Sequence, residues 1–155
     1  MPKVSVGLLL HRVTREGLEV LLVHPGGPFW ARRDHGAWSI PKGEPGEGED
    51  PLAAARREFH EETGFAADGP AICLGQVRQP GGKTVQAWAV AGDIDPARLH
   101  SNTFELEWPR GSGRRQAFPE VDRAAWFDLT EARRRILPAQ RTFLDALPGA
   151  LDVPR

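Results

Sequence analysis

The stretch over residues 43–65, GEPGEGEDPLAAARREFHEETGF, constrains the fold more than any other part of this 155-residue chain. Asp50 can cap the first free amides of a helix, and Pro51 suits the first helical position. The Leu-Ala-Ala-Ala-Arg-Arg run has high helix propensity, and Gly64 can end the helix in a left-handed conformation. The sequence therefore predicts a helix over 51–63, entered through a glycine-rich loop.

One face of this helix gathers carboxylates. At about 100° per residue, Glu58, Glu61 and Glu62 project together. As structure alone this is unfavourable, because Glu58 and Glu62 repel each other by roughly 0.2–0.5 kcal/mol and the helix dipole disfavours anions in the last turn. Mg²⁺ prefers carboxylate and carbonyl oxygens, so it would reverse both penalties. The alternative is a solvated face whose charges pair with Arg56 and Arg57.

The spacing of the whole stretch is more specific than its charges. It has the form G-x5-E-x7-R-E-U-x-E-E-x-G-U, where U is a bulky apolar residue, and every defined position is filled, by Gly43, Glu49, Arg57, Glu58, Phe59, Glu61, Glu62, Gly64 and Phe65. This pattern resembles the Nudix box. The resemblance implies a hydrolase that cleaves a nucleoside diphosphate linked to a further group, usually with Mg²⁺ or Mn²⁺. It also implies an α+β fold, the Nudix α/β/α sandwich, with a mixed sheet between the box helix and a C-terminal helix.

The resemblance also implies roles for individual residues. The metal ligands would be Gly43, Glu58, Glu61, Glu62 and Glu120. The catalytic set would be Glu58, Glu61, Glu120 and Arg57. In this set Arg57 pairs with Glu49 and holds the loop–helix–loop geometry, and Gly64 ends the helix. The general base differs among Nudix enzymes, and both Glu58 and Glu120 match family positions.

Glu120 is the candidate outside the box. The segment VDRAAWFDLTEA that follows it is similar to the late strand and the start of the closing helix in Nudix hydrolases. In several of them a loop glutamate shortly before the strand's tryptophan completes the metal site or acts as base. The alternative is a surface glutamate paired with Arg123.

Two segments rich in glycine, proline and arginine are expected to be irregular and to face the substrate: PGGPFWARRDHG (25–36) and PRGSGRRQAFPE (109–120). An aromatic ring beside cations can stack a base and hold phosphate. The candidate substrate-binding residues are Lys42, Trp30, Arg32, Arg33, Arg114 and Arg115. The two loops carry five arginines, Arg32, Arg33, Arg110, Arg114 and Arg115, and this number of cations favours a nucleoside triphosphate or a dinucleoside polyphosphate as substrate. Alternatively, Trp30 packs within its loop and Lys42 is solvated, while Trp38 is expected to pack in a strand.

The remaining pattern predicts the secondary structure around the box. Strands are expected over 3–10, 19–24, 71–77, 84–90 and 103–108, with a short strand in AWSIPKGE (37–44). Helices are expected over 130–137 and 139–147, broken by Pro138. We expect one Nudix domain over 1–147 and a loosely ordered tail over 148–155.

Composition excludes several other classes. With 40% hydrophobic and 26% charged residues, the chain is typical of one globular domain. A net charge of −1 provides no basic field, so we expect a small-molecule nucleotide and no stable nucleic-acid partner. The single cysteine, Cys73, cannot form an internal disulfide, and no segment has the pattern of a signal peptide or membrane span. A cytoplasmic monomer or homodimer is expected. The rival function is a catalytically silent Nudix domain that binds nucleotide or a protein partner.

Overall fold

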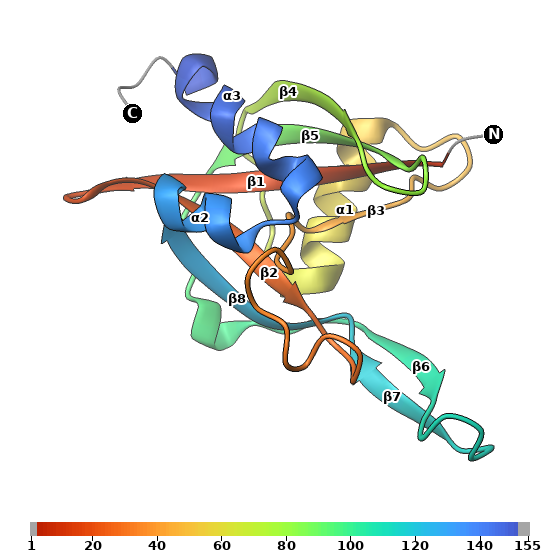
Figure 1. Cartoon of the computed structure of the whole chain (residues 1–155). Coiled ribbons are helices and arrows are strands. Elements are labelled where there is room, and N and C mark those ends of the chain that lie inside the picture. Colours follow the sequence, from red (N-terminus) through yellow and green to blue (C-terminus); the bar gives the residue numbers. More distant parts are fainter. Residues whose placement is uncertain (1–2, 152–155) are drawn as a thin grey trace.

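A computed structural model describes residues 3–151 of the chain (Figure 1). Its centre is a six-stranded sheet in the order β4-β5-β1-β2-β8, with the short β3 also paired to β1. The pair β1·β5 is parallel and the other pairs are antiparallel. The strands of this sheet are β1 (Val4–Thr14), β2 (Gly17–Pro25), β3 (Lys42–Gly43), β4 (Ala71–Arg78), β5 (Thr84–Ala91) and β8 (Val121–Asp128).

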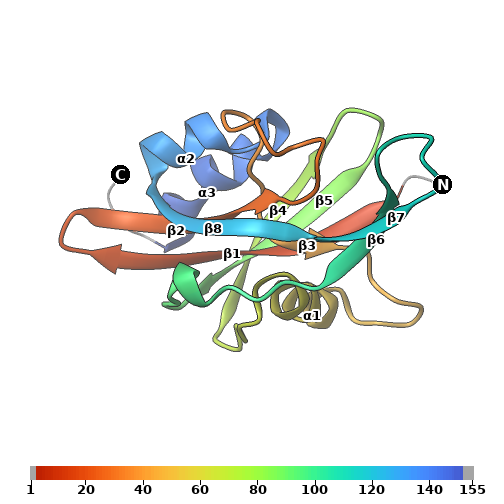
Figure 2. The same cartoon turned by 90° about the horizontal axis from the view of Figure 1, so that it is seen from below.

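Helices cover both faces of this sheet (Figure 2). One face packs against α1 (Pro51–Thr63), and the other against α2 (Leu129–Arg135) and α3 (Arg141–Leu151), while η1 (Pro96–Arg98) and η2 (Pro138–Gln140) are short 3₁₀ turns. The predicted α+β class and α/β/α sandwich are therefore confirmed. Over residues 3–151, no helix is long and apolar enough to cross a membrane.

The central strand β1 is buried on both faces, which explains its nearly continuous apolar run. Successive side chains of a strand point to opposite faces. Leu8 and Leu10 accordingly pack on the α1 side with Phe59, whereas Leu9 packs on the other side with Phe143 of α3. Each side chain is at most 2% exposed, so these two half-cores fix where α1 lies against the sheet.

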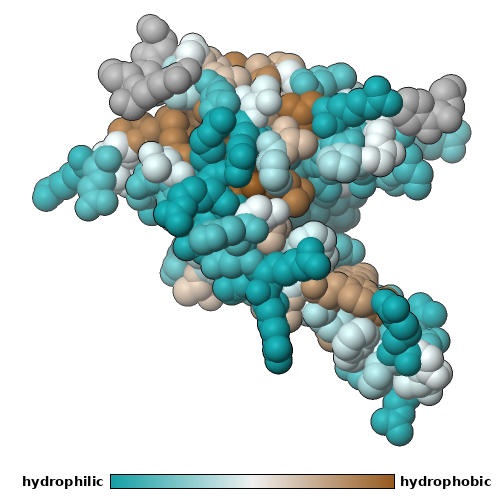
Figure 3. Space-filling view, in the orientation of Figure 1, coloured by the Kyte–Doolittle hydropathy of each residue, from teal (hydrophilic) through white to brown (hydrophobic). Residues whose placement is uncertain are grey.

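The segment predicted to be an irregular loop over 109–120 contains a strand. Residues Arg115–Pro119 form β7, which pairs antiparallel with β6 (Thr103–Glu107) in a separate two-stranded sheet. This hairpin projects from the body of the molecule (Figure 1), and Figure 3 shows a hydrophobic patch on it among hydrophilic side chains. Glycine, proline and arginine made the segment look irregular, but pairing with β6 supplies the backbone hydrogen bonds that local composition does not predict.

Several predicted boundaries also differ. β1 continues to Thr14 and meets β2 at a two-residue turn. The strand expected over 37–44 is reduced to β3 and isolated bridges, because Pro41 has no amide to donate. Pro138 lies in η2 between α2 and α3, as its helix-breaking character predicts. The tail expected from Pro148 is helical to Leu151, and residues 152–155 lie outside the described part of the chain.

Candidate active site

The box helix begins and ends where its local signals predict. The Asp50 side chain accepts a hydrogen bond from the Ala53 amide at 3.0 Å, and Pro51 takes the first helical position. Gly64 has φ of 81° and donates its amide to the His60 carbonyl at 2.7 Å. A residue with a Cβ is strained at this φ, so glycine is suited to the helix end.

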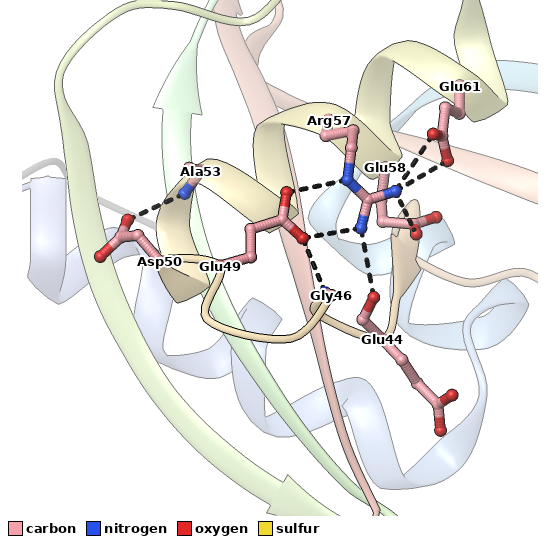
Figure 4. Close-up of polar contacts among 8 residues, drawn as sticks. All are labelled: Glu44, Gly46, Glu49, Asp50, Ala53, Arg57, Glu58 and Glu61. Atoms are coloured by element: carbon pink, nitrogen blue, oxygen red, sulfur yellow. Dashed lines mark hydrogen bonds and ion pairs between the residues drawn. The ribbon is translucent and has the colours of Figure 1, made fainter.

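Arg57 clamps the glycine-rich loop onto the helix (Figure 4). Its Nε and Nη2 donate to the two carboxylate oxygens of Glu49 at 2.9 and 3.0 Å, which is the two-point contact inferred from the sequence. Nη2 also donates to the Glu44 carbonyl at 3.2 Å, and the Gly46 amide donates to Glu49 at 2.8 Å. The hydrogen bonds from Arg57 and Gly46 lower the pKa of Glu49 to about 2.

The same guanidinium reaches the acidic face of the helix. Nη1 of Arg57 donates to Glu58 at 3.0 Å and to both oxygens of Glu61 at 3.1 Å (Figure 4). The Glu61 carboxylate is therefore turned toward the clamp. Burial raises the pKa of Glu58, and the neighbouring charge of Glu61 adds to this effect.

Gly43 brings the loop backbone against Glu58. It pairs with Val6 across the β1·β3 ladder, so its position is set by the sheet. A Cβ built on Gly43 would overlap the Glu58 carboxylate, so only glycine leaves that carboxylate where it lies. The backbone of residue 43 and the carboxylate of residue 58 thus form one surface.

Glu62 is half-buried near the C-terminal end of α1. Desolvation by burial raises the pKa of its carboxyl to about 8, and the charges of Glu58 and Glu120 act in the same direction. The Lys42 ammonium and a hydrogen bond from the Lys42 backbone oppose this shift. Lys42 is half-buried, and the desolvation of its amine lowers the pKa of that amine, as does the charge of Lys83. The site thus holds acidic and basic groups that are poorly solvated, an arrangement that is frequent at functional sites.

Lys42, Gly43 and Glu62 line a cavity of about 460 Å³, whereas Arg57, Glu58 and Glu61 do not. Its lining residues come from β1, β2, β3, α1, the β4–β5 turn and the start of β8: Lys3, Ser5, Val23, Pro25, Ser39, Ile40, Lys42, Gly43, Glu44, Glu62, Lys83, Glu120 and Val121. Glu120 is exposed on the cavity wall, and its backbone is fixed because its amide donates to the Asn102 carbonyl and its carbonyl accepts from the Gly26 amide, both at 2.9 Å. The cavity therefore brings the box residue Glu62 together with Glu120, although Glu120 lies 58 residues further along the chain.

The cavity includes some of the predicted substrate residues and not others. Lys42 lines it, but Trp30, Arg32, Arg33, Arg114 and Arg115 do not. Trp30 is half-buried with the Arg33 guanidinium 5.6 Å from its ring centre, and Arg115 lies 3.6 Å from Glu105 on the projecting hairpin. Trp38 is buried, as its packing interpretation predicts.

Among the cavity residues that sequence reasoning missed are Lys3, Ser5 and Lys83. Lys3 immediately precedes β1, Ser5 lies at its start, and Lys83 immediately precedes β5. The rarity of lysine in the sequence is a signal that could have pointed to Lys3 and Lys83. The chain has only three lysines among its 20 basic residues, and the remaining one, Lys42, is beside Gly43 of the box.

The carboxylates suit a divalent cation in their chemistry. Glu58, Glu62 and Glu120 influence one another's charge, and Gly43 has no side chain to block the space beside Glu58. Over residues 3–151, no three His, Cys, Asp or Glu side chains are already arranged as a metal-ligand set. Glu58 and Glu61 accept hydrogen bonds from Arg57, so their side chains would have to rotate away from it to complete such a set. The donor set nevertheless fits Mg²⁺ or Mn²⁺, both of which take oxygen ligands.

Fold, box and cavity together define a protein of the Nudix class, and comparison with known proteins agrees. The family model for the NUDIX domain matches residues 1–147, and the chain belongs to the Nudix hydrolase family. The resemblance noted in the sequence is thereby confirmed.

The individual similar proteins either match only part of this chain or have low sequence identity to it. The RNA pyrophosphohydrolase of Caulobacter vibrioides is 44% identical over 62 residues, which are 37% of this chain and 36% of that protein. The chain thus matches about a third of the length of that relative. The Ap4A hydrolase of C. elegans, in a binary complex, has a TM-score of 0.68 at 20% identity, covering 96% of this chain and 98% of that one. The NUDIX domain of Shewanella oneidensis NrtR, complexed with ADP ribose, also has a TM-score of 0.68, at 16% identity, covering 97% and 89%.

Proposed function

We propose that this protein hydrolyses a pyrophosphate bond in a nucleoside diphosphate-linked substrate, with a divalent cation, and that the substrate is a nucleoside triphosphate or a dinucleoside polyphosphate. One observation carries the proposal: Glu62, Glu120 and Lys42 line a single cavity beside Glu58, and Arg57 braces the loop that supplies Lys42 and Gly43. The RNA pyrophosphohydrolase and Ap4A hydrolase among the similar proteins support this reaction class.

Glu58, Glu62 and Glu120, with the Gly43 carbonyl, would hold Mg²⁺ or Mn²⁺, and Glu61 could join them on leaving Arg57. When bound, the cation neutralises charge on phosphate oxygens and increases the acidity of water. The protein's own part is positioning and electrostatics, which account for most of the catalysis of phosphoryl transfer. Desolvation of the half-buried Glu62 strengthens its interaction with charge.

The remaining residues orient the substrate and move the proton. Lys42 offers an ammonium group to a phosphate oxygen from within the cavity. Arg57 keeps the box loop against the helix through its two contacts with Glu49. Glu58 and Glu120 are the candidates to take a proton from the attacking water.

A substrate screen with a phosphate-release readout tests the proposal. The panel contains nucleoside triphosphates, dinucleoside polyphosphates, ADP-sugars and diphosphoinositol polyphosphates, each with Mg²⁺, with Mn²⁺ and with chelator. We expect release from at least one polyphosphate that stops in chelator. Glu62→Gln should reduce turnover at least about 100-fold at fixed Mg²⁺, since even outer-shell partners of a metal commonly cost about 10–100-fold.

The matched control is Glu16→Gln, which removes the same charge from an exposed residue in the β1–β2 turn and should leave turnover unchanged. Full activity in chelator, or wild-type turnover in Glu62→Gln, would contradict the proposal. Nucleotide binding without release across the whole panel would instead indicate the catalytically silent module.

A further inference from the structure

Besides its carboxylates, the cavity has a set of lysines, which form its basic wall. The chain contains only three lysines, Lys3, Lys42 and Lys83, and all three line this cavity. Every other fixed positive side chain is an arginine. Gathering like charges in one cavity is unfavourable unless anions compensate them, and Glu44, Glu62 and Glu120 line the same cavity. The lysines that these carboxylates leave without a close ion pair are the ones that an external anion would stabilise. A basic wall of this kind is typical of a site for a negatively charged ligand.

The sheet brings these lysines together from distant parts of the sequence. The Thr84 amide donates to the Lys3 carbonyl at 3.0 Å, and Val4 is in register with Thr84 in the parallel β1·β5 pair. On the other side of β1, Lys42 pairs with Gly7 through β3. Neighbouring strands lie about 4.8 Å apart, so the backbones of Lys3 and Lys83 lie close together, whereas Lys42 lies opposite Gly7, four residues further along β1. The basic wall is therefore built on rigid elements.

The partners of these amines within the protein are few. Lys3 lies 3.9 Å from Glu44, and both side chains are at least half exposed, so this pair contributes little. Lys83 forms no ion pair within residues 3–151. The amines of Lys3 and Lys83 are thus left free to bind an anion from solution.

Ser5 supplies an independent observation. Its side chain is 0% exposed, it lines the same cavity, and its hydroxyl has no hydrogen-bond partner among the described residues. A buried hydroxyl without a partner typically costs about 1–3 kcal/mol. A phosphate oxygen in the cavity would accept this hydrogen bond and remove the penalty.

We propose that Lys3, Lys83 and Ser5, together with Lys42, form a subsite for a phosphate group that lies outside the scissile bond. The inference rests on the proposed function and narrows its substrate class to nucleotides with three or more phosphates in a chain. In an ADP-sugar both phosphates belong to the bond that is cleaved, so none is left for this subsite. Lysine suits this task because its ammonium is a compact charge with three donors that can follow a flexible polyphosphate.

Binding of inorganic tripolyphosphate in Mg²⁺ buffer, measured by calorimetry, tests the subsite directly. The single variants Lys83→Gln and Lys3→Gln should each bind it about tenfold more weakly, which is the loss of one charge-assisted contact. The control Arg98→Gln removes one exposed positive charge outside the cavity and should bind as wild type does. Circular dichroism verifies that the variants are folded.

Lysine labelling gives a second readout that does not depend on turnover. Because the chain has three lysines, reductive methylation followed by peptide mass spectrometry reports each amine separately. Saturating tripolyphosphate should protect Lys3 and Lys83. Equal labelling with and without tripolyphosphate, or equal affinity of Lys83→Gln and wild type, would overturn the proposal.

Kinetics separate failure of this inference from failure of the proposed function. If hydrolysis occurs, Lys83→Gln should raise KM for a nucleoside triphosphate about tenfold and leave KM for ADP-ribose unchanged. Hydrolysis with a KM that Lys83→Gln does not change would contradict the subsite and support the proposed enzymatic function. Binding of tripolyphosphate that depends on Lys83, without hydrolysis of any substrate, would support the subsite and contradict the proposed enzymatic function.

Discussion

Replacement of Gly43 with alanine should disable the site and leave the fold intact. The added Cβ would overlap the carboxylate of Glu58, and the sheet holds residue 43 in register with Val6, so the backbone has little freedom to move away. The overlapping atoms belong to the far end of a flexible side chain. The Glu58 carboxylate is therefore the part that rotates away.

The expected magnitudes follow from this geometry. A displacement of about 1 Å in a reacting or ligand group can cost about 100-fold in rate, which corresponds to about 2.7 kcal/mol in the barrier. The stability cost is much smaller. Rotation of Glu58 gives up its 3.0 Å contact with the half-exposed Arg57, and such pairs are typically worth about 1 kcal/mol or less. Gly43→Ala should thus lower kcat at least about 100-fold and change the free energy of unfolding by about 1 kcal/mol or less.

The assay measures kcat with the substrate found in the screen, and the free energy of unfolding by urea denaturation. Gly46→Ala is the matched control in the same loop, because its Cβ would lie 3.4 Å from the nearest Glu49 oxygen, an ordinary contact. Wild-type kcat in Gly43→Ala would refute the reasoning. An equal loss in both variants would show that the loop tolerates no side chain at all and that Glu58 is not the cause.

Three further predictions concern neighbouring residues. Arg57→Lys keeps the charge but cannot make the two-point contact with Glu49, so turnover should fall several-fold; wild-type turnover would show that the contact does not hold the loop. Glu120→Gln should lower kcat by roughly 10²–10⁴-fold at unchanged metal requirement if Glu120 is the base, whereas a raised Mn²⁺ requirement would make it a ligand. The folded-state pKa of Glu62 is about 8, above its ordinary 4.5, so its proton stabilises the folded metal-free protein at low pH. That contribution should be lost as pH rises from about 4.5 through 8, and denaturation in chelator at pH 5 and pH 9 should show a smaller loss for Glu62→Gln than for wild type.

The sequence alone determined the box helix, and its resemblance to the Nudix box indicated the arginine clamp. Asp50, Pro51 and Gly64 act through contacts three or four residues away, so their signals are complete within a short stretch. Arg57 and Glu49 are only eight residues apart, and the helix start between them leaves few ways to join them. Local interactions of this kind depend little on the rest of the fold.

Pairing between distant strands determined secondary structure that local composition did not predict. The strand β7 looked irregular because its glycine- and arginine-rich surroundings have low strand propensity, and its partner β6 supplies the missing hydrogen bonds. The arginines of the two loops suggested a polyphosphate substrate, but Arg114 and Arg115 lie on the projecting hairpin outside the cavity. A sequence shows how many charged residues a loop contains, but it does not show where the fold places their side chains.

The basic wall was decided by the tertiary structure alone. Lys3, Lys42 and Lys83 are separated by about forty residues at each step, and they share a cavity only because β1 pairs with β3 on one side and runs parallel to β5 on the other. Parallel pairing requires a long crossover, here one that includes α1 and β4, so no short-range pattern records it. Their common location follows from the register of the sheet, which is set by burial of β1 on both faces.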